Sequence, residues 1–153
     1  MRSNEVNVRE FARRDQNQAK AVILKGLGEH FGFIDHDANP DIDDIEKTFL
    51  LAGHSFFVAE RAGRVVGAAG LLFETSLSAR IVRMSVDIAH RRLRVASLLL
   101  GACRDAARRR GMRELRAFTE PHWDNAMRFY LSAGFVQYGR DAVDVHLRLP
   151  LFP

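Results

Sequence analysis

The chain is 153 residues long, 47% of its residues are apolar, and its formal net charge at pH 7 is +4. This length suits one compact domain over residues 1–153 and excludes two domains of ordinary size. No run of about 18 apolar residues is present and the segment MRSNEVNVRE is polar, which argues against a membrane-spanning helix or a secretory signal, so we expect a soluble, cytoplasmic protein.

One strand and two helices are predicted in the first third of the chain. The segment Val6–Phe11 is typical of a short strand, and a period near 3.6 residues predicts a helix over Asp15–Gly28, with Asp15 as its N-cap. The polar segment that follows ends at Pro40, a residue favoured at the start of a helix. A second helix is therefore predicted over Asp41–Ala52.

Three strands are predicted next, over Ser55–Glu60, Val65–Glu74 and Ala79–Asp87. A short turn with a glycine separates the first two, which is the pattern of a hairpin. The third strand carries apolar side chains on both faces, so we expect both faces to be covered. The side chains expected to share one face of it are Val82, Met84 and Val86.

Helices and strands are predicted to alternate in the rest of the chain. The helices cover Arg94–Arg110 and Trp123–Ala133, and the strands cover Glu114–Glu120, Phe135–Tyr138 and Val143–Leu151. A strand-helix-strand crossover at each helix requires parallel neighbours in the sheet. The sequence thus predicts an α/β (α+β) domain with a single mixed, mostly antiparallel central sheet flanked by helices.

Cys103, the single cysteine, falls on the apolar stripe of the helix predicted over Arg94–Arg110. No neighbouring signal marks its thiol as activated, so we interpret Cys103 as part of the core rather than as a nucleophile. No group of histidines and cysteines has the spacing of metal ligands, and no metal is predicted.

Arginines crowd the segment HRRLRVASLLL, where a strand leads through a turn into a helix. The free N–H groups at a helix start bind anions, and guanidinium groups add charge to such a site. Arg91, Arg92 and Arg94 therefore make this turn a candidate phosphate site. An ordinary basic helix start explains the same pattern.

This turn resembles the pyrophosphate loop of the GCN5-related N-acetyltransferases (GNAT superfamily), which has the pattern (Q/R)-x-x-G-x-(G/A). Arg91 and Ala96 match its first and last positions, whereas Arg94 replaces the glycine. The backbone N–H groups stay in place for phosphate if Arg94 has an ordinary negative φ, so we expect binding to survive with slightly altered contacts.

A second resemblance to the family lies in DNAMRFYLSAGF, which is similar to its A-x-x-(F/L)-Y-x-x-x-G-F segment. Five positions match at fixed spacing on a helix and the strand after it. Trp123 stands where many members have asparagine, and Asn125 follows two residues later, so either is a candidate for that role. The matching positions are Ala126, Phe129, Tyr130, Gly134 and Phe135.

The resemblance implies the GNAT-like acyl-CoA N-acyltransferase fold, acetyl-CoA as co-substrate, and direct transfer of the acetyl group to a small-molecule or peptide amine. It also implies a possible homodimer, and the segment GLGEHFGFIDHDANPDIDDI is similar to one found in a group of bacterial members. The implied cofactor-binding residues are Met84, Ser85, Val86, Arg91, Arg92, Arg94, Val95, Ala96, Ser97, Asn125 and Tyr130.

Tyr130 is the predicted general acid, because the resemblance places it at the thiolate and a tyrosine is still protonated at neutral pH. An amphipathic core residue would show the same pattern. The family's glutamate base aligns with Arg80 and is therefore absent. Glu120 is our leading candidate for the base, together with His122, and Glu74, His30 or a chain of waters are the alternatives.

The acidic segment from Asp35 to Glu46 falls where the family forms part of its acceptor site, so it is predicted either to attract a protonated amine or to be a solvated loop. Two other classes of function remain. A non-catalytic acyl-CoA-binding sensor would share the same fold. Nucleic-acid binding is not predicted, because no aromatic side chains interleave the arginines between Arg80 and Arg116.

Overall fold

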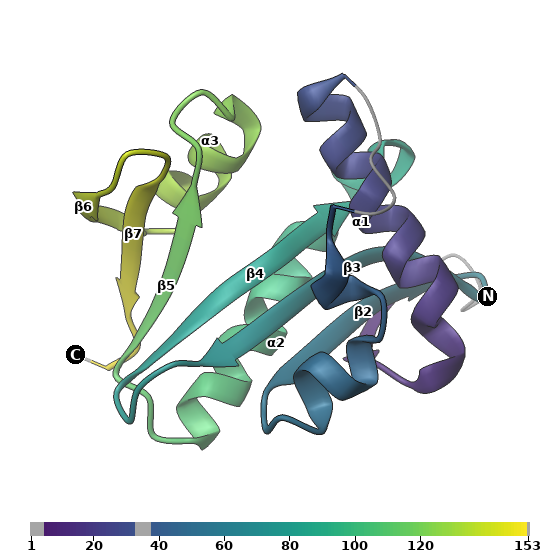
Figure 1. The fold of residues 1–153 in the computed structure, drawn as a ribbon, viewed down its shortest axis with the longest axis horizontal. Helices are drawn as coiled ribbons and strands as arrows, with labels where there is room; N and C mark the ends of the chain where they lie inside the picture. Colours follow the sequence, from purple (N-terminus) through teal and green to yellow (C-terminus); the bar gives the residue numbers. More distant parts are fainter. Residues whose placement is uncertain (1–4, 33–37, 153) are drawn as a thin grey trace.

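A computed structural model describes residues 5–32 and 38–152. Within these ranges the chain forms a seven-stranded sheet of order β1-β2-β3-β4-β5-β7-β6 (Figure 1). The strands are β1 (Val6–Glu10), β2 (Ser55–Arg61), β3 (Arg64–Phe73), β4 (Ser78–Val86), β5 (Glu114–Thr119), β6 (Val136–Arg140) and β7 (Val145–Pro150). The α-helices are α1 (Gln16–Phe31), α2 (Val95–Arg109) and α3 (Asp124–Ser132), and the short helical turns are η2 (Arg13–Asp15), η3 (Pro40–Ile42), η4 (Glu46–Leu50) and η5 (Ile88–Leu93).

The sheet is mixed and mostly antiparallel, which confirms the predicted fold class. Among the described strands, only β4 and β5 pair in parallel, and the crossover between them is α2. The prediction that the two strands on either side of α3, β5 and β6, are also parallel neighbours is wrong. The last strand, β7, inserts between β5 and β6 and pairs antiparallel with both, so the crossover through α3 skips one position in the sheet.

The helix predicted over Asp41–Ala52 is also wrong in form. The segment instead makes the 3₁₀ turn η3 and the π-helical turn η4. Three apolar side chains, Ile42, Ile45 and Phe49, are buried at 0 to 2% exposure and hold both turns against the sheet.

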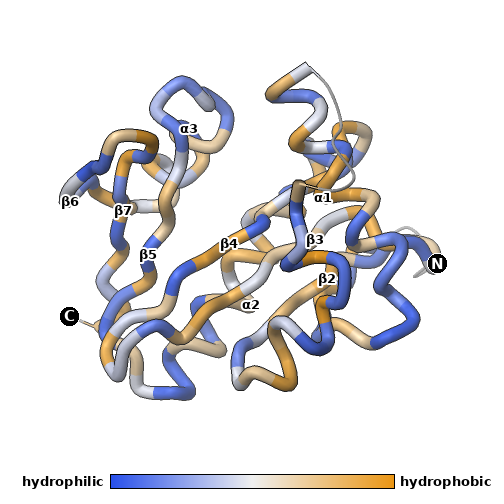
Figure 2. The backbone as a smooth tube through the Cα atoms, viewed as in Figure 1, coloured by the Kyte–Doolittle hydropathy of each residue, from blue (hydrophilic) through white to orange (hydrophobic). Residues whose placement is uncertain are grey.

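Two hydrophobic clusters cover the opposite faces of the sheet. One contains the inward side of α2, and the other contains that of α1 together with η3 and η4. In Figure 1, α2 passes behind β3 and β4 while α1 lies on the near side, and Figure 2 shows the apolar stretches of the central strands between them. Cys103 is buried on α2 as predicted, and burial raises the pKa of its thiol to about 12.

The strands β4 and β5 separate after a short parallel contact, and this separation positions the site. They pair only over Ser78–Ile81 of β4, and they diverge beyond it toward α1 and α3 (Figure 1). The remainder of β4, from Val82 to Val86, pairs with β3 alone in the described part of the chain. One edge of β4 therefore faces the opening instead of another strand.

A bulge in β4 changes which way its side chains point. The register with β3 shifts between Ala68 and Gly70, and Arg83 has a φ of 56°. As a result, Val82 packs with the α1 cluster, whereas Met84 and Val86 pack with the α2 cluster. The prediction that these three side chains share one face is wrong because a bulge breaks the alternation of a regular strand.

Candidate active site

Two cavities open where β4 and β5 separate. The larger has a volume of about 570 Å³ and extends from the start of α2 to α1 and α3. The smaller, about 360 Å³, lies beside α1, β4 and β5. Both fall in the size range of small-molecule sites. We call them the larger cavity and the smaller cavity.

The two cavities meet at a shared wall that is formed by β4 and α3. A ligand in each cavity would therefore have one end at this wall, next to the Tyr130 side chain. The residues that line both cavities are Met84, Ser85, Trp123, Ala126 and Tyr130.

Most of the predicted cofactor residues line the larger cavity: Met84, Ser85, Val86, Arg91, Ala96, Asn125 and Tyr130. Arg94 and Ser97 are not among its lining residues, and Val95 is fully buried in the core. The side chain of Arg92 lies outside the described part of the structure. The residues predicted from the sequence thus form one wall of this cavity, which consists of β4, the start of α2, and α3.

The start of α2 has the geometry of an anion site. Its first turn contains no acidic residue and has no side-chain cap, and the first helical hydrogen bond runs from the Leu98 N–H to the Arg94 carbonyl. The N–H groups of Val95, Ala96 and Ser97 precede that bond and point away from the helix with the positive end of its dipole.

Arg94, the N-cap of α2, has a φ of 61° and a ψ of 29°, which is the left-handed conformation. The condition of an ordinary negative φ is therefore not met. Glycine adopts this conformation without cost, and it is the residue that the GNAT pattern has at this position. The backbone at Arg94 thus has the conformation that glycine would adopt, although an L side chain is strained in it.

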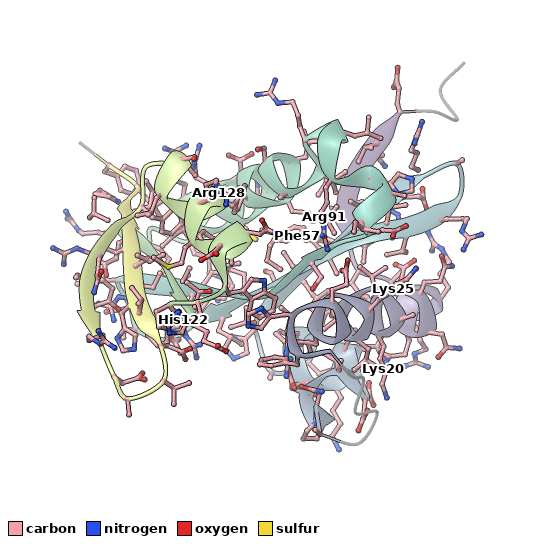
Figure 3. The ribbon with its side chains drawn as sticks, turned by 90° about the horizontal axis from the view of Figure 1, so that it is seen from above. Lys20, Lys25, Phe57, Arg91, His122 and Arg128 are labelled. Carbon is pink, nitrogen blue, oxygen red and sulfur yellow. The ribbon has the colours of Figure 1, made fainter. Side chains whose placement is uncertain are left out.

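Arg91 is held at the edge of the larger cavity by two contacts. Its guanidinium lies 2.6 Å from the carboxylate of Glu29 on α1, and its Nε donates to the Val86 carbonyl at 3.2 Å. Figure 3 shows Arg91 between α1 and α2. Of the charged residues that line the larger cavity, the arginines Arg91 and Arg128 are matched in number by the carboxylates Glu29 and Asp124.

Tyr130 is buried, and its ring packs edge-to-face against Phe129 and Phe135. Burial raises the pKa of its hydroxyl above the usual range, with a further increase from Cys103, so the hydroxyl keeps its proton. None of the hydrogen bonds between described residues involves this hydroxyl, and no buried side-chain polar atom among them lacks a partner. The hydroxyl therefore faces the cavities.

The structure brings two of the four candidate bases together. Nε2 of His30 lies 3.5 Å from Oε2 of Glu120, and the imidazole stacks on Trp123 at a centroid distance of 4.0 Å and an angle of 4°. His30 lines the larger cavity. The other two candidates lie elsewhere: His122 is exposed, and Glu74 is paired with Arg80.

Trp123 and Asn125, the two candidates for the family's asparagine, have different positions. Trp123 is the N-cap of α3, but its side chain makes no cap hydrogen bond. Its backbone carbonyl accepts from the Met127 N–H at 3.0 Å, and its ring lines both cavities. Asn125 lies in the first turn of α3 and lines the larger cavity only.

The described carboxylates of the acidic segment are paired with other groups of the protein, whereas Asp35 and Asp37 lie outside the described residues. Asp41 binds Arg83 at 2.6 Å, and the other carboxylates bind basic side chains or a backbone N–H in the same way. These contacts favour the interpretation as a paired surface segment. The further contacts are Asp43 with Lys20, Glu46 with Arg13, and Asp44 with the Lys47 N–H.

Several cavity residues were not predicted from the sequence. Gly26 and Glu29 come from α1, and Phe118 and Asp144 come from the β5 and β7 region. No local pattern marks them, because they reach the cavities through contacts between distant parts of the chain. Over residues 5–32 and 38–152, no helix is long and apolar enough to cross a membrane, and no three His, Cys, Asp or Glu side chains group as metal ligands.

Comparison with known proteins identifies the class to which this fold and site belong. Residues 21–135 match the Acetyltransferase (GNAT) family, and the chain belongs to this family. It is 33% identical to N-acetyltransferase 8F1 of Rattus norvegicus over 71% of this chain and 52% of the relative. It is 32% identical to N-acetyltransferase 8B of Homo sapiens over 76% of this chain and 54% of the relative, so the chain spans about half the length of these curated relatives.

Solved structures with the same fold extend over nearly the whole chain. A GNAT-family acetyltransferase of Staphylococcus aureus superposes with a TM-score of 0.87 at 23% identity, covering 97% of this chain and 100% of that one. PaiA N-acetyltransferase of Thermoplasma acidophilum, determined in complex with coenzyme A, gives a TM-score of 0.84 at 13% identity, covering 95% and 99%. These likenesses confirm the fold.

Proposed function

We propose that this protein is an acetyl-CoA-dependent N-acetyltransferase that acts on a primary amine of a small molecule or peptide. The observation that carries the proposal is the meeting of the two cavities at Tyr130, with the anion site of α2 at the other end of the larger one. This arrangement suits a long phosphorylated thioester on one side and an amine on the other.

The residues of the larger cavity fit acetyl-CoA. The uncapped N–H groups at the start of α2 and the Arg91 guanidinium suit the pyrophosphate. The free edge of β4 at Met84, Ser85 and Val86 suits the pantetheine arm, which carries amides. YncA of Salmonella typhimurium, which was determined with its cofactor acetyl-CoA, has the same fold at a TM-score of 0.73 and supports this assignment.

The bound thioester supplies an activated acetyl group, and the protein supplies position and proton transfer. The amine nitrogen attacks the carbonyl carbon directly, so that a C–N bond forms and the C–S bond breaks. A backbone N–H near Ser85 or Val86 polarises the carbonyl oxygen, and the shared wall holds the two reactants next to each other.

Tyr130 gives its proton to the departing thiolate. Its buried hydroxyl stays protonated because burial raises its pKa. Glu120 takes the proton that the amine loses, and His30, which contacts it at 3.5 Å, relays this proton from the larger cavity. The ring of Trp123 holds His30 in place for this step.

A non-catalytic acyl-CoA sensor of the same fold is the alternative function. A thiol-release assay with acetyl-CoA over a library of amines separates the two. Release of free CoA that depends on an amine supports the acetyltransferase. Binding of acetyl-CoA in calorimetry without release on any amine would identify a sensor.

A further inference from the structure

The charged side chains that line the smaller cavity differ in whether they form ion pairs. Its lining includes Arg80, Arg83 and Asp144. Both arginines are held by a carboxylate: Arg80 donates three hydrogen bonds to Glu74 at 3.0, 3.0 and 2.8 Å, and Arg83 donates two to Asp41 at 2.8 and 2.6 Å. Their positive charges are therefore already neutralised by carboxylates.

Asp144 has no ion-pair partner over residues 5–32 and 38–152, and its half-buried side chain lines the smaller cavity. The turn before β7 fixes its backbone. The Asp144 N–H donates to Oδ1 of Asp141 at 2.8 Å, and the Asp141 N–H donates to the Asp144 carbonyl at 2.9 Å. Oδ2 of Asp141 is in turn 2.7 Å from His146 Nε2. The Asp144 carboxylate is thus presented from a rigid turn.

Apolar side chains form much of the remaining wall of the smaller cavity. They come from α1, β4, β5 and the start of α3, which are the elements around the opening in the sheet. A carboxylate in an apolar surrounding favours a cation more strongly than it would in water. These side chains are Ile23, Leu27, Val82, Phe118 and Trp123.

Resting on the proposed function, we infer that the acceptor is a small diamine: a primary amine that reacts at the shared wall, joined by a short apolar chain to a second cationic group that binds Asp144. The reacting nitrogen must lie beside Tyr130, which lines both cavities, and must be uncharged when it attacks. Asp144 lines the smaller cavity alone. Its charge therefore suits the far end of the acceptor.

An acceptor with a carboxylate at its far end is disfavoured by the same geometry. It would face Asp144 directly, and like charges repel. The cations among the described lining residues are Arg80 and Arg83. An acceptor carboxylate could bind one of them only by displacing Glu74 or Asp41, and the arginine would then lose a bidentate ion pair.

Three acceptors of matched length test the inference: pentane-1,5-diamine, pentylamine and 5-aminopentanoate, which end in a cation, a methyl group and an anion. We expect kcat/KM to fall in that order. The value for the diamine should be about tenfold above that for pentylamine, because one partly desolvated ion pair strengthens binding by about this factor. Equal or better turnover of 5-aminopentanoate would overturn the inference.

Asp144→Asn supplies the second measurement. It should remove the preference for the diamine over pentylamine while leaving the Kd for acetyl-CoA, whose cavity Asp144 does not line, within about twofold. An unchanged preference would show that Asp144 does not bind the acceptor. Asp105→Asn, an exposed aspartate on α2, is the matched control.

The outcomes separate this inference from the proposed function. Release of CoA on other amines but on none of these three would overturn the diamine assignment alone. Absence of release over the whole amine library would overturn the proposed acetyltransferase activity itself.

Discussion

Arg91 and Glu29 form an ion pair of 2.6 Å that joins the turn before α2 to α1 at the edge of the larger cavity. The guanidinium that suits the pyrophosphate is thus occupied by a carboxylate when no ligand is present. Binding of an anion at the start of α2 must compete with Glu29 for the same group.

Glu29→Gln should therefore tighten acetyl-CoA binding. Exposed ion pairs of this kind contribute up to about 1 kcal/mol, so we expect the Kd to fall about threefold in calorimetry. The gain should vanish in the Glu29→Gln, Arg91→Ala double variant. A gain that persists without Arg91 would mean that Glu29 repels the ligand independently of this pair.

Arg94→Gly should raise the stability of the protein. Glycine adopts the left-handed conformation of this position freely, so the free energy of unfolding should increase by about 1 kcal/mol in urea. Arg94→Ala removes the same charge but keeps the strain, and should bring no such increase. If alanine and glycine stabilise equally, the side-chain charge and not the backbone causes the effect.

The same Arg94→Gly variant tests how the cofactor is held. The backbone N–H groups of α2 remain in place, so the Kd for acetyl-CoA should stay within about tenfold, or roughly 1.4 kcal/mol. A larger loss, shared by Arg94→Ala, would show that the Arg94 guanidinium itself binds the ligand.

Much of the fold could be predicted because its signals are local. The continuous apolar runs of β2 and β3, the apolar stripe of α2 and the turn residues around them depend on neighbours in the sequence. The insertion of β7, the bulge at Arg83 and the π-helical turn at Phe49 depend instead on contacts between distant segments. No periodicity within one segment encodes such contacts.

The site, like the fold, could be predicted where its signals are local in the sequence. The wall of the larger cavity that β4, the start of α2 and α3 provide carries the GNAT motifs, and there Arg91, Ala96 and Tyr130 were found from the sequence. The wall that α1 provides has no motif, so Glu29 was missed and His30 was only an alternative base. The relay that we propose for His30 rests on its contact with Glu120 at 3.5 Å.

Tyr130→Phe should lower kcat by about 100-fold in the thiol-release assay, in the range that proton transfer by one side chain contributes. The phenyl ring keeps the packing against Phe129 and Phe135, so the Kd for acetyl-CoA should not change. Tyr138→Phe on β6 loses the same hydroxyl away from the cavities and is the control. An unchanged kcat would remove Tyr130 from the mechanism.

Glu120→Gln should reduce kcat/KM for amines by 10-fold or more, about the lower range for a lost proton acceptor, while leaving acetyl-CoA binding intact. Glu10→Gln is the matched control, because Glu10 is exposed on β1 and lines neither cavity. Its kcat/KM should remain near that of the unmodified protein. Equal effects of the two variants would contradict the assignment of the base.

Asp141→Asn should change the acid stability of the protein. The N–H groups of Asp144 and Val143, together with His146, lower the pKa of Asp141 to about 2. In the unfolded chain this carboxyl group has a pKa of about 3.9. Its ionised form therefore stabilises the folded state above about pH 4, and this contribution is lost as the pH falls toward 2.

We therefore expect Asp141→Asn to unfold more easily in urea at pH 7, with the difference from the unmodified protein shrinking as the pH falls from about 5 to 2. Asp105→Asn, on the exposed side of α2, should show no such convergence. A difference that stays constant over this range would mean that the Asp141 carboxylate does not hold the turn. Because the same turn presents Asp144, Asp141→Asn should also weaken any preference for a diamine acceptor.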